Sequence, residues 1–235
     1  MRAWLLVSIL ALAACDRAKP IASEYPAETT AFDIKGGEGL PFIVGKDMRP
    51  VWNLEPGDEP RRLGHFDSKD QTGAKLSEEK LRGKVTMVSF FFTDCSGICP
   101  MTTGNLLEAQ KKFLNDDRFE ILSFSVSPDT DKPKKLAEFA KLRHISHRRW
   151  RLATGKKDEI YALARKSFNA DTISPAENAK KKVTSKDFLH SENVFLLDGE
   201  LRLRGVYNGM MRGSVQEMMA DAEKLASAET GRVLK

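Results

Sequence analysis

The chain has 235 residues, of which 41% are hydrophobic, 30% charged and 8% aromatic. This is enough for one packed domain of ordinary soluble composition, so a second domain is not required. The formal net charge of +5 favours acidic partners or an anionic membrane surface. Because the basic residues are scattered rather than gathered on one helix or stripe, we expect no nucleic-acid partner.

The N-terminal stretch MRAWLLVSILALAACD predicts a secretory signal peptide. It starts with the positive Arg2, and its apolar run is shorter than the roughly 20 residues that a transmembrane helix needs. Leu12-Ala13-Ala14-Cys15 resembles a bacterial lipobox, in which the cysteine is lipidated and becomes the new N-terminus. We therefore expect residues 1–14 to be removed and Cys15 to carry lipid. An ordinary signal peptide with a chance cysteine is the alternative.

Export places the chain in an oxidising compartment, where disulfides are permitted. There are three cysteines, so lipidation of Cys15 leaves Cys95 and Cys99 as a pair. Residues 15–39 contain few large apolar side chains and predict a tether that lifts a folded domain, residues 40–230, off the membrane. The expected location is the bacterial cell envelope, on the periplasmic face of the inner membrane, with a lipid anchor.

Short elements open the domain: two strands within residues 40–52, broken at Gly45-Lys46-Asp47, then a strand, a turn at Thr72-Gly73, and a short helix from Ser77 to Leu81. From Val85 onward, strands and helices alternate. The predicted order is strand 85–92, helix 100–114, strand 119–126, helix 132–142, strand 150–153, helix 158–168, a hairpin of 192–197 and 201–207, and a last helix that Ser214 caps and that ends near Leu225.

This order predicts an α/β protein with a central sheet flanked by helices. The run VTMVSFFF is typical of a strand buried on both faces. Strands and helices in this order resemble the thioredoxin fold, with extra N-terminal strands and an inserted loop, the polar stretch 169–188, before the C-terminal hairpin.

Cys95 follows the buried strand, and Cys99 precedes Pro100, a residue favoured in a first helical turn. Sites in open α/β sheets gather at this carboxyl edge. If the intervening residues are helical, the Cα atoms lie about 6 Å apart, which permits a disulfide or one shared metal ion. The positive helix end should lower the pKa of both thiols. A purely structural disulfide remains an alternative, although a bond that closes so small a loop contributes little to the stability of the fold.

Two sulfurs do not complete a metal site, and the chain has four histidines. We expect His65, His144 and His147 to lie on the surface. His190 directly precedes the strand 192–197. If that strand pairs antiparallel beside strand 85–92, His190 lies at the cysteine end of the sheet. The position of His190 alone leaves the alternative that this histidine has a structural role and binds no metal.

The segments FFFTDCSGICP, LSFSVSPDTDKP, WRLATG and FLHSENVFLLD resemble the SCO/SenC family of thioredoxin-fold proteins, over roughly Gly64 to Leu225. The resemblance implies that Cys95, Cys99 and His190 bind one copper ion, as Cu(I) or Cu(II). It also implies a role in assembling the copper centre of a cytochrome oxidase, with the copper-receiving subunit or another copper chaperone as partner. Two thiolates and an imidazole suit Cu(I), whereas structural zinc would need four protein ligands.

The chain departs from the family pattern at Ser127, where many members carry an aspartate before the proline. Asp131 does match a familiar acidic position, and it either caps the following helix or lies near the site. Met101, beside the cysteines, is expected to pack in the core.

The alternative function is a copper-independent thiol–disulfide oxidoreductase of the cell envelope. Thioredoxin-like reductases carry Trp-Cys-x-x-Cys and a proline that faces the cysteines. This chain has Thr93-Asp94 before Cys95, three spacer residues, and no proline in FLHS. These differences favour a copper-binding assembly factor over a turnover enzyme.

Overall fold

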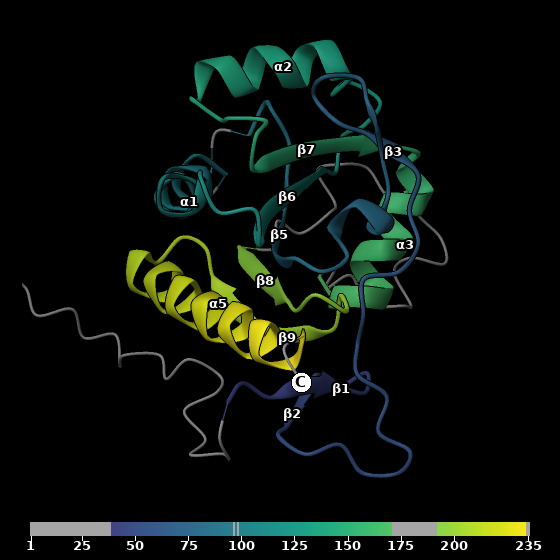
Figure 1. Ribbon diagram of the computed structural model, residues 1–235. Coiled ribbons are helices and arrows are strands. Elements are labelled where there is room, and N and C mark those ends of the chain that lie inside the picture. Colours follow the sequence, from purple (N-terminus) through teal and green to yellow (C-terminus); the bar gives the residue numbers. More distant parts are fainter. Residues whose placement is uncertain (1–38, 96, 98, 171–191, 234–235) are drawn as a thin grey trace, which may run out of the picture.

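The computed structural model describes residues 39–95, 97, 99–170 and 192–233 (Figure 1). The predicted signal peptide, Cys15, nearly all of the predicted tether, the polar excursion from residue 171 onward and His190 lie outside these ranges.

A seven-stranded mixed sheet with the order β4-β3-β7-β6-β5-β8-β9 forms the centre of the domain. Its central strands β5, β6 and β7 are parallel, and the other strands pair antiparallel on either side. Every residue of β5 and β6 is buried, as the continuous apolar runs predict. The strands are β3 (Ser68–Lys69), β4 (Lys75–Leu76), β5 (Val85–Phe91), β6 (Phe119–Ser125), β7 (Trp150–Gly155), β8 (Asn193–Leu197) and β9 (Leu203–Asn208).

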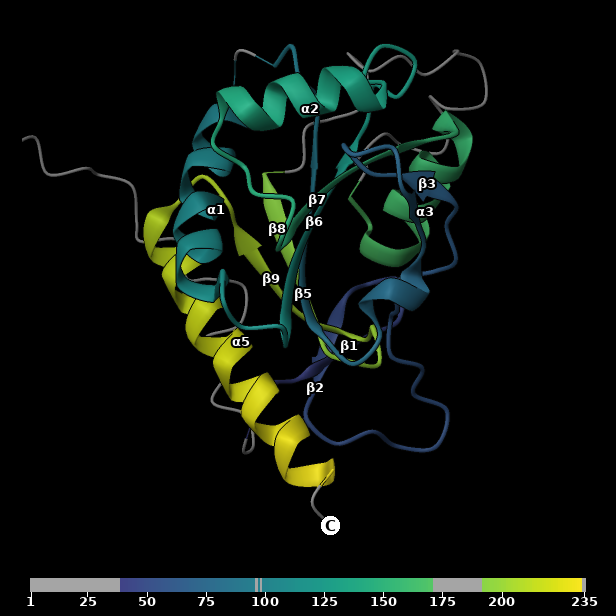
Figure 2. The ribbon, with the colours of Figure 1, turned by 45° about the horizontal axis from the view of Figure 1, so that its top comes forward.

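Helices cover both faces of this sheet. Figure 2 shows β5, β6 and β7 side by side between α1 on one face and α3 on the other, with α5 beside α1. The helices are α1 (Cys99–Phe113), α2 (Pro133–Leu142), α3 (Lys157–Phe168) and α5 (Arg212–Val233), with a 3₁₀ turn η1 (Glu78–Leu81). A two-stranded sheet of β1 (Phe42–Val44) and β2 (Arg49–Val51) packs beside β9. The predicted fold class, with its extra N-terminal strands, is confirmed.

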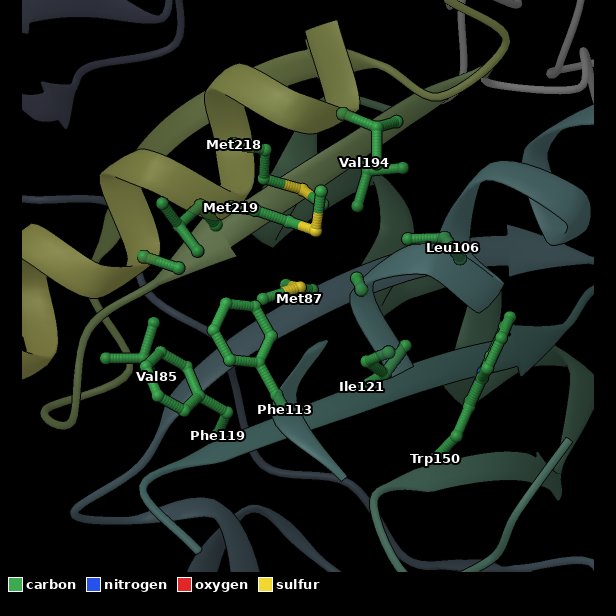
Figure 3. Packing of buried hydrophobic residues seen from close by; sticks show 14 of the residues in the cluster. Val85, Met87, Leu106, Phe113, Phe119, Ile121, Trp150, Val194, Met218 and Met219 are labelled. Carbon is green, nitrogen blue, oxygen red and sulfur yellow. The ribbon is translucent and has the colours of Figure 1, made fainter. Parts of the chain in front are cut away.

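The hydrophobic core on the α1 and α5 face fixes these helices against the sheet. Met218 and Met219 point from α5 toward Met87 of β5 (Figure 3). Phe113 at the end of α1 stacks on Phe119 of β6, with ring centroids 4.0 Å apart. Each such side chain contributes about 1.5–3 kcal/mol when fully buried, so the end of α1 opposite the cysteines is held firmly.

The last helix differs from its prediction at both ends. α5 begins at Arg212 and continues to Val233, so Ser214 is not its cap and Leu225 is not its end. The Ser214 hydroxyl instead accepts a hydrogen bond from the Asn208 amide at 3.0 Å and ties the helix to β9. This tertiary use of the serine cannot be distinguished from capping by sequence pattern alone.

Candidate metal centre

Cys95 and Cys99 lie together just beyond the carboxyl end of β5, as predicted. Both are free thiols, and they lie close enough for the Cys95 side chain to raise the pKa of Cys99. Cys99 is the first residue of α1, so Cys95 precedes the helix and the two thiols do not share a helical face. The turn after β5 brings them together, with the Cys95 amide donating to the Phe92 carbonyl at 3.3 Å.

The two thiols differ in exposure. Cys99 is 6% exposed and packs in the core cluster, whereas Cys95 is half-buried. Burial raises the pKa of the Cys99 thiol to about 12, and the neighbouring Cys95 side chain adds to the rise. The expectation that the helix end lowers both thiol pKa values is therefore wrong for Cys99, because desolvation outweighs the helix dipole there. To bind a metal ion, Cys99 would have to release this proton to solvent.

Asp131 supports the loop that carries Cys95. Its buried carboxylate accepts hydrogen bonds from the Thr93 amide (3.1 Å), the Thr93 hydroxyl (2.6 Å) and the Ser125 hydroxyl (2.6 Å). Helix α2 has Lys132 at its N-cap and no side-chain cap, so the capping alternative for Asp131 is wrong. The carboxylate links the end of β6 to the residue two positions before Cys95.

Asp131→Asn is expected to destabilise the protein by about 2–3 kcal/mol, because hydrogen bonds to a charged group are each worth about 1.5–3 kcal/mol and the amide keeps only some of them. Thermal or urea unfolding measures the loss. The matched control is Asp129→Asn, which changes an exposed carboxylate two residues earlier. Equal stabilities for the two variants would show that the Asp131 contacts contribute nothing.

Strand β8 begins at the cysteine end of the sheet. It pairs antiparallel with β5, with Val88 opposite Phe195 and Thr86 opposite Leu197, which is the condition stated above for placing its beginning at the cysteine end. Gly209, just after β9, lies between α1 and the residue that precedes β8. A Cβ built on this glycine would lie 2.7 Å from Thr102 Cγ2 in α1 and 2.9 Å from the Glu192 carbonyl oxygen. Glu192 therefore lies beside the first turns of α1, within two residues of His190 along the chain.

Within the described ranges, no third histidine, cysteine or carboxylate joins the two thiols in a cluster that could hold a metal ion. His65, His144 and His147 are exposed, as predicted. Met101 is 52% exposed, so its predicted core packing is wrong. Its position at the start of α1 leaves the side chain at the surface beside the cysteine loop.

Comparison with known proteins gives the family. The SCO1/SenC family model matches residues 55–227, which is more than half of the chain. The chain therefore belongs to the SCO1/SenC family. The SCO1 protein homolog of Bacillus subtilis is 31% identical over 164 residues, covering 69% of this chain and 81% of that protein.

Solved structures share the fold. BsSco, described as a member of the Sco family of cytochrome c oxidase assembly proteins with a disulfide switch, is 30% identical; the match has a TM-score of 0.59 and covers 72% of this chain and 95% of that one. Arabidopsis thaliana ScoI, solved with copper bound, is 24% identical; the match has a TM-score of 0.53 and covers 70% of this chain and 98% of that one.

Proposed function

We propose that this protein is a copper-binding assembly factor for the copper centre of a cytochrome oxidase, and that Cys95, Cys99 and His190 hold one copper ion. The observation that carries the proposal is the pair of adjacent free thiols at the carboxyl end of β5, the edge at which β8 begins, three residues after His190 in the sequence. Two thiolates and one imidazole form a soft ligand set that suits Cu(I). Family membership and the copper-bound Arabidopsis structure support the choice of metal.

Copper is the cargo in this function, and the thiols control its release. Oxidation of the two thiolates to a disulfide removes two ligands and delivers two electrons to an acceptor disulfide, which becomes two thiols after taking up two protons. One site can therefore deliver copper or reduce a disulfide of a copper-receiving subunit to two thiols. The reported disulfide switch of BsSco supports this coupling.

The experiment that tests this function against the copper-independent oxidoreductase measures both activities on the same reduced protein. Copper uptake is followed by competition with a Cu(I) chelator, and disulfide reduction is followed with and without copper. We expect about one copper per chain. Disulfide reduction without any copper uptake would favour the oxidoreductase.

We further propose that the protein is anchored through lipid on Cys15 at the periplasmic face of the inner membrane, where a copper-receiving oxidase subunit or another copper chaperone is its partner. The lipobox-like Leu12-Ala13-Ala14-Cys15 supports the anchor. No helix in the described part of the chain is long and apolar enough to cross a membrane.

Cys15→Ala is expected to move the protein out of the membrane fraction or to leave its leader uncleaved, because the lipid attachment point is lost. Membrane fractionation and the mass of the mature protein measure the change. An unaltered mass and membrane fraction would contradict lipidation of Cys15.

A further inference from the structure

Helix α1 contains a buried hydroxyl that has no partner among the described residues. Thr102 is 9% exposed, its Oγ1 is shielded from solvent, and no residue in the described ranges gives that oxygen a hydrogen bond. An unpaired buried hydroxyl destabilises a fold, and threonine in a helix commonly avoids this by donating to the preceding turn. A buried hydroxyl that stays unpaired in a native protein often marks a group that acts in another state of the protein.

Thr102 lies three residues after Cys99 on the same helix. Residues three apart are neighbours on a helix, and side chains lean toward its N-terminus, so Thr102 covers the turn that begins at Cys99. Both residues line one cavity of about 10 Å³, which is too small for anything larger than a single water molecule.

The threonine side chain is held in place by its methyl group. Thr102 Cγ2 lies 2.7 Å from the point that a Cβ on Gly209 would occupy, so the methyl group contacts the backbone after β9. Ser89 and Ser123, which line the same cavity, already pair with each other at 2.7 Å. The Trp150 indole also donates to Ser123, at 2.9 Å. Thr103 lines the cavity too, but among the cavity's hydroxyls it is Thr102 Oγ1 that is buried without a hydrogen-bond partner in the described ranges, and it lies on the same turn of α1 as Cys99.

Conversion of the Cys99 thiol to a thiolate would give the Thr102 hydroxyl a hydrogen-bond acceptor. In the reduced protein Cys99 is a free thiol, and a neutral thiol is a weak acceptor. A metal ligand must be a thiolate, and a thiolate accepts strong, charge-assisted hydrogen bonds. Hydrogen bonds of this kind to coordinating atoms commonly contribute 10–100-fold in metal affinity.

We propose that Thr102 is a positioning residue of the copper site, whose hydroxyl donates a hydrogen bond to the Cys99 sulfur once that sulfur is a copper-bound thiolate. The inference rests on the proposed function, because it needs Cys99 as a ligand. The hydroxyl lowers the stability of the metal-free protein and raises its affinity for copper.

The test compares Thr102→Val with Thr102→Ser. Valine keeps the methyl contact and the side-chain shape but has no hydroxyl. We expect metal-free Thr102→Val to melt at the same temperature as wild type or higher, to bind Cu(I) about tenfold more weakly, and to shift the thiolate–Cu(II) absorption band. Thr102→Ser keeps the donor and should restore both affinity and band position. Thr86→Val, which removes a buried hydroxyl at the far end of β5, should leave both unchanged.

The possible results distinguish a failure of the proposed function from a failure of the inference about Thr102. If the wild-type protein binds no copper, the proposed function and this inference both fail. If it binds copper and Thr102→Val matches it in affinity and absorption, only the inference fails. If Thr102→Val melts at a lower temperature without copper, the hydroxyl is already satisfied, for example by a buried water, and the inference is overturned.

Discussion

Replacing either Cys95 or Cys99 by serine is expected to abolish tight copper binding. The remaining thiolate and one imidazole are too few soft ligands to hold Cu(I) against competing thiols, and a serine hydroxyl does not replace a thiolate. The two variants should nevertheless differ in fold stability. Cys99 is buried in the core cluster and Cys95 is half-buried, so Cys99→Ser places a polar hydroxyl in the more apolar position.

His190→Ala should weaken copper binding strongly without abolishing it, because both thiolates remain. Cu(I) affinity by chelator competition measures all three variants, and His144→Ala, which removes an exposed histidine, is the matched control. Wild-type affinity in His190→Ala would remove that histidine from the site. Wild-type affinity in either serine variant would place the copper elsewhere.

Oxidation of the cysteine pair is expected to lower copper affinity by several orders of magnitude. A disulfide consumes both thiolates, so the oxidised protein can offer copper only His190 and weak oxygen ligands. The two thiols are already neighbours in the reduced protein, near enough for Cys95 to raise the pKa of Cys99, so the loop can bring them together as a disulfide. Copper bound beforehand should protect the thiols, since a ligand that binds only the reduced form shifts the equilibrium toward that form.

The measurement is copper affinity on protein that mass spectrometry shows to be fully reduced or fully oxidised. The control is Cys15→Ala, which removes the third cysteine; although its membrane attachment changes, its copper affinity should match that of the wild type in both redox states. Equal affinity in the two redox states would separate the thiols from copper binding and remove the chemical basis for a carrier.

The sequence predicts the centre of the fold well because its signals there are strong and local. The apolar runs that become β5 and β6 are buried at every position, and a strand buried on both faces has little choice of environment. The placement of the cysteines follows from the same runs, since a strand followed by proline in the next helical turn fixes the edge of the sheet at which they lie.

What the sequence does not reveal depends on tertiary contacts. Asp131 reaches Thr93, 38 residues away in the chain, and no local pattern distinguishes that contact from a helix cap. The pKa of Cys99 depends on how deeply α1 sits in the core, which overrides the favourable helix end. Met101 and Thr102 are adjacent in sequence, yet one is exposed and the other buried, because the angle at which α1 leaves the cysteine loop decides which side faces the core.

X-ray absorption at the copper edge, on reduced protein loaded with one equivalent of Cu(I), tests the central claim most directly. The proposed site predicts a copper ion with two sulfur ligands and one nitrogen ligand, with one sulfur lost in Cys95→Ser and in Cys99→Ser and the nitrogen lost in His190→Ala. A copper ion surrounded only by nitrogen and oxygen atoms, or a spectrum that none of these variants changes, would contradict the account.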